Sequence, residues 1–241
     1  MNILWIVKDI ISPKKCYFCG TEWYFFCLKC YWKAHKIPEL CYVCKKESSK
    51  FAIHLECRQF LDARSLMVLF SYSRVQKIIK DSKYYAKKDV LEDIGKYMWE
   101  FLLKNLQPEN KEEYIILPVP MNIWRKWKRW YNHADVLAKH ISVSSWIAYN
   151  AKILKRVKNT LQQSKLTRSQ RFSNLEGAFQ VNQKHKDLLK DKKIIIVDDV
   201  VSTWVTFLEV WVVLRDQDIQ SIDCIAIASD TQFFDEKVKK W

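Results

Sequence analysis

The chain has 241 residues, of which 49% are aliphatic, aromatic or cysteine and 28% are charged. This length and balance exclude a low-complexity polypeptide and are typical of a soluble globular protein with one large domain and a small one. The formal net charge of +14 favours polyanionic partners such as nucleic acid, phosphorylated metabolites or an anionic membrane face, with a solvated basic surface as the alternative.

The amino-terminal stretch MNILWIVKDIISP is a poor match to a secretory signal, because Lys8 and Asp9 interrupt its short apolar run. Elsewhere, no apolar run approaches the roughly 20 residues of a transmembrane helix. We therefore expect a cytoplasmic protein without membrane insertion.

The amino-acid composition is unusual in having 3 glycines and 11 tryptophans. An average glycine content of about 7% would give roughly 17 glycines in a chain of this length. Several tryptophans lie in polar contexts, such as NIWRKWKRWYN. In some bacterial lineages the codon UGA is reassigned to glycine, whereas another common code reads UGA as tryptophan. We hypothesise that many of these tryptophans are glycine in the native protein; the alternative is a protein that is truly rich in tryptophan.

Seven of the eight cysteines lie in the first 57 residues, mostly in CxxC pairs. Such a pair presents two thiolates to one tetrahedral Zn²⁺, so four ligand pairs complete two sites. Taken in sequence order, one site contains Cys16, Cys19, Cys27 and Cys30, and the other contains Cys41, Cys44, His54 and Cys57. Interleaved pairing remains open, and a disulfide framework is the competing interpretation. Complete ligand sets leave no open coordination position, which indicates structural zinc.

Strand-like and helix-like segments alternate after about residue 61. The expected strands are 65–73, 113–120, 151–157, 192–199 and 219–229, and the expected helices are 74–85, 88–106, 131–141 and 205–217. This alternation predicts a doubly wound α/β fold with a parallel sheet, which binds ligands at the carboxyl ends of its strands. We expect a double zinc ribbon over residues 1–60 and the α/β domain over residues 61–241.

The segment IIIVDDVVSTWVTF, residues 194–207, combines a buried strand, two carboxylates and a hydroxyl-rich turn before a helix. Main-chain N–H groups and the helix dipole converge at such a turn and can bind a phosphate. The hydroxyl groups that could contribute belong to Ser202, Thr203 and Thr206. A phosphate cradle needs glycine so that the backbone can close on the anion, yet Trp204 lies in this turn.

This segment resembles the ribose-phosphate motif of type I phosphoribosyltransferases, DDVVTTGAT. The resemblance implies that Asp198 and Asp199 contact the ribose hydroxyls of phosphoribosyl pyrophosphate. It also implies a loop around the 5′-phosphate made by Ser202, Thr203, Trp204, Val205 and Thr206. Trp204 occupies the glycine position of the motif, as the recoding hypothesis expects.

Two further segments resemble the ComF family of competence-associated phosphoribosyltransferase-like proteins, which also carries an amino-terminal double zinc ribbon. The first matches the pattern PVP…RGFNQA at Arg129, Tyr131 and Asn132, with Trp130 at the glycine and His133 at the glutamine. The second matches at Arg156, Thr160, Gln163, Leu166, Arg171, Asn174 and residues 177–179. Outside these motifs, Trp23 in a turn between cysteine pairs and Trp146 after a helix fit glycine positions.

The resemblance implies transfer of a phosphoribosyl group, with loss of pyrophosphate and with Mg²⁺ carried on the diphosphate. Arg129, Arg156 and Arg171 are the candidate pyrophosphate clamps, because a guanidinium group binds phosphate oxygens bidentately. The acceptor is unidentified, and the family association points to DNA uptake, with single-stranded DNA and uptake helicase or channel proteins as partners. A non-catalytic accessory that handles single-stranded DNA is the alternative, and a zinc-ribbon adaptor for proteins is a third.

Overall fold

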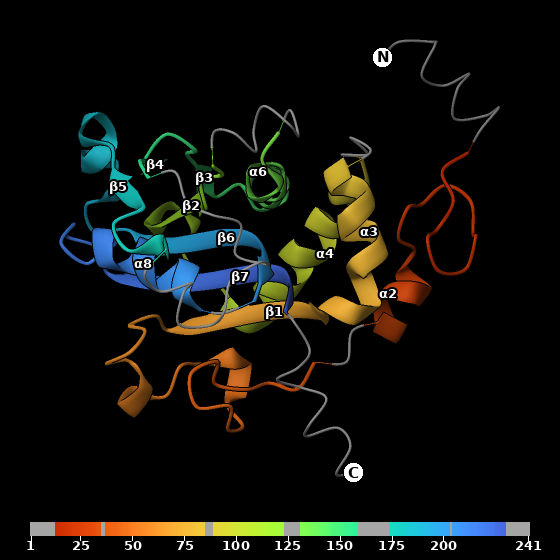
Figure 1. The fold of residues 1–241 in the computed structure, drawn as a ribbon, viewed down its shortest axis with the longest axis horizontal. Helices are drawn as coiled ribbons and strands as arrows, with labels where there is room; N and C mark the ends of the chain where they lie inside the picture. Colours follow the sequence, from red (N-terminus) through yellow and green to blue (C-terminus); the bar gives the residue numbers. More distant parts are fainter. Residues whose placement is uncertain are drawn as a thin grey trace.

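The computed structural model describes residues 13–34, 37–84, 89–122, 131–158, 174–202 and 204–229. Its centre is a five-stranded parallel sheet in the order β1-β7-β6-β2-β3 (Figure 1). The strands are β1 (Ser65–Ser71), β2 (Tyr114–Pro118), β3 (Ala148–Tyr149), β6 (Lys193–Val201) and β7 (Ser221–Ser229). A separate antiparallel pair contains β4 (Leu154–Arg156) and β5 (Phe179–Val181).

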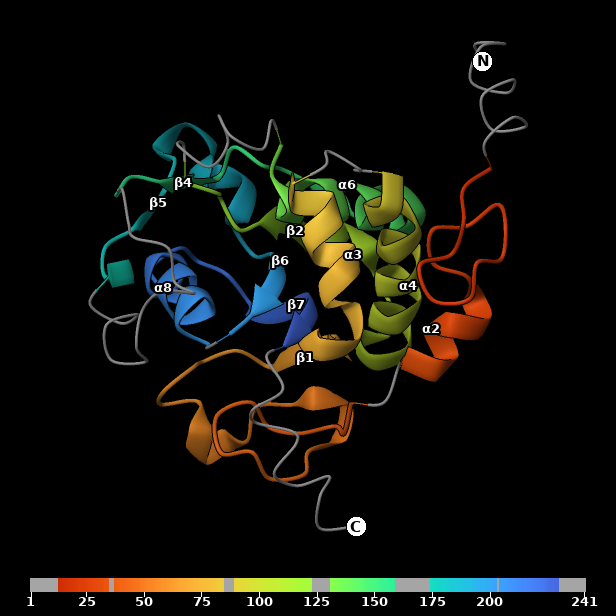
Figure 2. The same cartoon turned by 45° about the vertical axis from the view of Figure 1, so that its right-hand side comes forward.

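Helices cover both faces of the sheet, with α8 on one side and α3, α4 and α6 on the other (Figure 2). The helices are α2 (Leu28–Ala34), α3 (Tyr72–Tyr84), α4 (Asp89–Leu106), α6 (His133–Ser145) and α8 (Val205–Leu214). Short 3-10 segments are Ser49–Phe51, Leu55–Cys57, Lys111–Glu113 and Gln183–Leu189. The predicted doubly wound α/β architecture is confirmed.

The near-continuous apolar run of β6 follows from its burial on both faces. Ile194 and Ile196 pack in the core beneath α8, whereas Ile195 and Val197 pack in the core beneath α3, α4 and α6. Successive side chains of a strand point to opposite faces, so each face of β6 receives half of the run.

The sheet has a topological switch point between β2 and β6, which pair in parallel from Tyr114↔Lys193 to Pro118↔Val197. From β2 the chain passes through α6 to β3, and from β6 it passes through α8 to β7, on the opposite side of the sheet. In open α/β sheets the crevice at such a point, at the carboxyl ends of the strands, is where ligands bind.

The two cysteine-bearing segments pack against opposite faces of this sheet. In the first, Phe26 is fully buried with its ring centroid 5.4 Å from Phe70 and 5.8 Å from Tyr97, beside α4. In the second, Ile53 lies in the core beneath α8, and its amide donates to the Arg64 carbonyl at 2.8 Å. Both segments are therefore continuous with the core of the α/β region.

Three expectations can be compared directly with the structure. The strand expected over 65–73 ends at Ser71, because α3 begins at Tyr72 without an intervening loop. The strand expected over 151–157 is only Leu154–Arg156 and pairs with β5 instead of joining the main sheet. Among the helices that the structure describes, none combines the length and apolar character needed to cross a bilayer.

Candidate functional site

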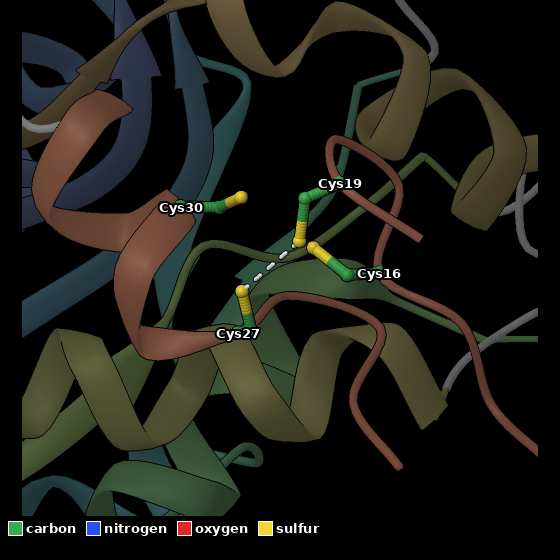
Figure 3. Close-up of side chains that lie close together, drawn as sticks. All are labelled: Cys16, Cys19, Cys27 and Cys30. Atoms are coloured by element: carbon green, nitrogen blue, oxygen red, sulfur yellow. Dashed lines mark hydrogen bonds between the residues drawn. The ribbon is translucent and has the colours of Figure 1, made fainter. Parts of the chain in front are cut away.

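The predicted metal ligands form two compact groups of four. Within each group, the sulfur and imidazole donor atoms all lie within 4.8 Å of one another. The groups are Cys16, Cys19, Cys27, Cys30 and Cys41, Cys44, His54, Cys57, so the structure assembles the ligands in sequence order. Figure 3 shows the first group, in which the sulfur atoms of Cys19 and Cys27 are 3.5 Å apart. All eight cysteines lie in the described residues and none forms a disulfide.

The donor chemistry of both groups fits zinc. Four thiolates, or three thiolates and one imidazole, are the ligand sets of structural zinc sites. The His54 Nδ1 atom lies 3.3 Å from the Cys44 sulfur, while its Nε2 atom lies 3.0 Å from the Glu47 carbonyl oxygen. An outer carbonyl partner of this kind orients a metal-binding imidazole. Two Cys/His clusters that could hold zinc are therefore present.

The first CxxC turn of each group has the same backbone geometry. The amide of Gly20 donates to the Cys16 carbonyl at 3.0 Å, and that of Lys45 donates to the Cys41 carbonyl at 2.9 Å. Both turn residues have a left-handed backbone, with φ of 73° for Gly20 and 64° for Lys45. The amino-terminal region thus contains the same turn twice.

Two tryptophans occupy backbone conformations that favour glycine. Trp23 has φ of 77° and is 59% exposed, and Trp146 has φ of 63° at the carboxyl end of α6 and is 86% exposed. The Trp146 amide donates to the Ser142 carbonyl at 2.8 Å, which is the hydrogen bond of a left-handed helix cap. A side chain costs about 1–2 kcal/mol in this conformation, and an exposed indole gains little packing to offset that cost.

Trp204 differs from these two residues. Its φ of −72° and ψ of 0° are accessible to any residue, and its half-buried side chain packs against the core beneath α8. Its backbone angles are therefore compatible with either residue type. The other tryptophan assigned to a motif glycine, Trp130, lies outside the described residues, as do Trp124 and Trp127.

The two predicted ribose-binding carboxylates lie near the carboxyl end of β6, at the switch point with β2. The strand continues past them in register, with Asp198 opposite Ala226 and Val200 opposite Ala228 on β7. Because neighbouring strand residues alternate between faces, the two carboxylates point to opposite faces of the sheet. Asp199 lies on the side of α3 and α6. Because Ile194 and Ile196 pack beneath α8, the same alternation assigns Asp198 to the α8 side.

Nitrogen groups from two other elements lie close to Asp199. The Lys83 ammonium, at the end of α3, lies 2.6 Å from the Asp199 Oδ2 atom. The His133 Nδ1 atom, at the start of α6, lies 3.9 Å from the same oxygen. The other Asp199 oxygen, Oδ1, accepts the Val200 amide at 2.7 Å.

Asp198 has a strongly shifted pKa. Its burial, followed by the negative charge of Asp199, raises the pKa of Asp198 to about 7. The Asp199 amide, which donates to the Asp198 Oδ1 atom at 2.8 Å, and the charges of Lys83 and Arg156 act in the opposite direction. A carboxyl group with this pKa can gain or lose a proton near neutral pH.

The described residues that were predicted to bind the 5′-phosphate lie just after β6 or at the start of α8. Val205 is fully buried in the first turn of α8 and Thr206 is nearly so, which leaves their main-chain amides as the groups available to a ligand there. Ser202 is partly buried directly after β6. Arg129, Arg171 and Thr203 lie outside the described residues.

Two predicted residues connect the loops around the switch point. The Asn132 side-chain amide donates to the Val119 carbonyl at 2.9 Å, which ties the start of α6 to the segment after β2. In turn, the Val119 amide donates to the Val197 carbonyl at 2.9 Å, one residue before the acid pair. Arg156, on β4, lies over the Phe179 ring at 5.2 Å and acts electrostatically on Asp198.

Sequence reasoning missed Lys83 and assigned no role to His133. Lys83 is one of many lysines in a basic chain and belongs to no motif, so only the fold brings it to Asp199. His133 differs from the family's glutamine, and its side chain is only 3% exposed. The one signal in the sequence was a histidine at the start of an amphipathic helix, where the family has glutamine.

No protein-family profile matches the chain. The chain is 34% identical over 113 residues to Competence protein F of Haemophilus influenzae, which covers 47% of this chain and 49% of that protein. It is 32% identical over 95 residues to DNA utilization protein YhgH of Salmonella typhi, which covers 39% of this chain and 40% of that protein. The chain thus spans about half the length, or less, of the curated relatives it matches.

Solved structures show weaker likenesses. Adenine phosphoribosyltransferase from Leishmania donovani is 14% identical with a TM-score of 0.37, covering 66% of this chain and 60% of that one. A hypothetical protein from Neisseria gonorrhoeae with bound ppGpp is 14% identical with a TM-score of 0.35, covering 58% of this chain and 68% of that one. By sequence, the chain is homologous to a competence protein over 47% of its length and to a DNA utilization protein over 39% of its length.

Proposed function

We propose that this protein binds phosphoribosyl pyrophosphate with Mg²⁺ at the switch point and transfers its phosphoribosyl group to an acceptor during DNA uptake. The observation that carries the proposal is the position of Asp198 and Asp199, at the carboxyl end of β6 directly before α8. Carboxylates there can accept hydrogen bonds from a sugar, and the start of the helix can receive a phosphate. The names of the homologous proteins support the setting in DNA uptake.

Each group of the site would have a distinct task. Asp199, kept ionised beside Lys83, accepts a hydrogen bond from one ribose hydroxyl, and Asp198 can donate or accept near neutral pH. The first amides of α8 have no partner within the helix, so they can donate to phosphate oxygens. Arg156, on the Asp198 side, supplies positive charge toward the diphosphate, together with the proposed clamps Arg129 and Arg171. Mg²⁺ bound to the diphosphate would neutralise part of its charge.

Transfer breaks the bond between ribose C1 and the pyrophosphate oxygen, which leaves with the electron pair, and forms a bond from C1 to the acceptor. The transition state carries positive charge on the sugar, so catalysis depends on positioning and electrostatic stabilisation. The carboxylates beside the sugar would contribute to both, because they fix the ribose and oppose its positive charge.

The recoding hypothesis is part of this proposal. Left-handed backbones at Trp23 and Trp146 support glycine at those positions, the phosphate-loop motif supports glycine at 204, and the PVP…RGFNQA pattern supports glycine at 130. Reading the gene tests the hypothesis directly. We expect UGA at codons 23, 130, 146 and 204, with UGG at Trp99, whose side chain packs against the core from within α4. UGG at all of these codons would contradict recoding.

Ligand binding is best tested in protein carrying glycine at positions 130 and 204. Calorimetric titration with phosphoribosyl pyrophosphate and Mg²⁺ should show saturable binding. The double substitution Asp198→Ala and Asp199→Ala should abolish it, because the ribose loses both acceptors, while circular dichroism should remain that of the folded protein. Equal binding by the double variant would remove the proposed ribose contact.

A second candidate function is a non-catalytic accessory that handles single-stranded DNA with uptake helicase or channel proteins as partners. The net charge of +14 favours this function, because binding to phosphates through lysine and arginine is largely electrostatic. Its signature would be salt-dependent binding of single strands without release of pyrophosphate from phosphoribosyl pyrophosphate. Release of pyrophosphate upon addition of an acceptor would favour the transferase function over the non-catalytic one.

A further inference from the structure

The last turn of α3 carries three consecutive residues that contact three different regions of the molecule. Asp81 lies beside the hydroxyl group of Tyr17, which belongs to the first cysteine turn. The Ser82 carbonyl accepts a hydrogen bond from the Tyr131 hydroxyl, just before α6. Lys83 pairs with Asp199 on β6. This turn is therefore held on two sides before Lys83 reaches the acid pair.

The contacts of Asp199 fix its carboxylate in one orientation. Lys83 lies 2.6 Å from Oδ2, and the Val200 amide donates to Oδ1, so each oxygen has a defined donor. A carboxylate has about four lone-pair sites, so it can accept several hydrogen bonds at once. The side chains of Lys83 and Asp199 are only 17% and 21% exposed, which limits screening of their attraction by water.

We propose that Lys83 is the positioning residue of this site, because its ammonium holds the Asp199 carboxylate charged and in one orientation. The contacts divide the pair: Lys83 and His133 lie next to Asp199, whereas the charges of Lys83 and Arg156 reach Asp198 and lower its pKa. The identity of the ligand rests on the proposed function, but the division of the pair does not.

Three variants of α3 distinguish the effect of the Lys83 charge from the effect of the size of its side chain. Lys83→Met removes the ammonium and keeps the length of the side chain, Lys83→Arg keeps the charge, and Lys80→Met removes an exposed charge three residues earlier as the matched control. Aspartate carboxyl titration by ¹³C NMR, without ligand, reports the two apparent pKa values of the pair.

Lys83→Met should raise the apparent pKa values of the pair by about one unit or more, because an opposite charge within hydrogen-bonding distance is lost. Lys83→Arg and Lys80→Met should titrate like the unmodified protein. Unchanged titration in Lys83→Met would overturn the proposal. Should Lys83→Met fail to fold, Asp199→Asn gives the second test: the remaining Asp198 should then titrate at a lower pH, and an unchanged pKa would also overturn the proposal.

Binding of phosphoribosyl pyrophosphate gives a second measurement. Its pH dependence would not change if Lys83 had only a structural role. At pH 7.5, Lys83→Met should weaken binding by about tenfold, the equivalent of one pKa unit, and should shift the pH dependence of binding upward. Binding by Lys83→Met with an unshifted pH profile would argue against the proposal. Failure of the unmodified protein to bind this ligand would refute the proposed function, whereas the NMR titration would still decide the role of Lys83.

Discussion

The cysteine clusters and the acid pair are both polar regions that border the apolar core. Their polar atoms are arranged in different ways. In each cluster, four ligand atoms within 4.8 Å of one another converge on one point, which a single tetrahedral ion would fill. At the acid pair, Asp199 lies beside the Lys83 ammonium, and burial raises the pKa of Asp198 to about 7. We therefore propose that the first region is a closed, structural metal site and that the second is an open, reactive site.

The largest expected effect is loss of a cluster ligand. Cys27→Ala should lower the zinc content from two ions to one and destabilise the protein by several kcal/mol, because metal binding contributes directly to folding. Zinc quantification and calorimetric unfolding measure both changes. Cys224→Ala, which removes a buried thiol in β7 outside both clusters, is the matched control and should retain both ions. Full zinc content in Cys27→Ala would contradict the closed-site description.

The second prediction concerns the pH dependence of stability at the open site. The pKa of Asp198 is raised to about 7 in the folded protein, so the folded state binds more protons than the unfolded state between about pH 4 and pH 7. The free energy of unfolding should therefore fall as pH rises through this window. Asp198→Asn should flatten this slope and stabilise the protein at pH 8 by on the order of 1 kcal/mol. Denaturant unfolding at several pH values measures the slope.

A matching substitution on the neighbouring acid sharpens this result. Removing the negative charge with Asp199→Asn should also reduce the slope, because the charge of Asp199 is the second cause of the raised pKa. An unchanged slope in both variants would mean that the acid pair does not titrate in this range, and the open-site description would fail.

The smallest expected effect concerns tryptophans at left-handed backbone positions. Trp23→Gly and Trp146→Gly should each raise the free energy of unfolding by up to about 1 kcal/mol, since the strain of the side chain is released and little packing is lost. Trp99→Gly is the control and should destabilise the protein, because it places glycine inside α4 and removes a packed side chain. Thermal unfolding shows whether each substitution stabilises or destabilises the protein. Destabilisation by all three substitutions would argue against native glycine at 23 and 146.

The two regions also differ in what the sequence could predict. The cysteine ligands come in closely spaced pairs, so local spacing was enough to find both groups, and the structure assembled them in sequence order. The strand at 192–199 was likewise recognisable from its apolar run, although it extends to Val201. By contrast, β3 and β5 contain only two and three residues, too few to show a period.

The acid pair was found from its motif, but its surroundings depend on long-range contacts. Lys83 lies far from Asp199 in the sequence and carries no local signal, and the division of the carboxylates between two faces follows from the continuation of β6 past them. Glycine-like positions were partly visible, since Trp23 and Trp146 lie in turn contexts. Only the backbone angles distinguish Trp23 and Trp146, whose φ is positive, from Trp204, whose φ is negative.

The most direct measurement compares two versions of the protein, one that retains Trp204 and one with Trp204→Gly, both with glycine at position 130. Each is titrated calorimetrically with phosphoribosyl pyrophosphate and Mg²⁺. In the proposed site, the turn between β6 and α8 would approach the 5′-phosphate with its main-chain amides, and an indole at this position would obstruct that approach. We expect saturable binding to the Trp204→Gly version and at least a tenfold weaker affinity when tryptophan is retained, roughly the effect of 1.4 kcal/mol. Equal affinity of the two versions would contradict the proposed sugar-phosphate site.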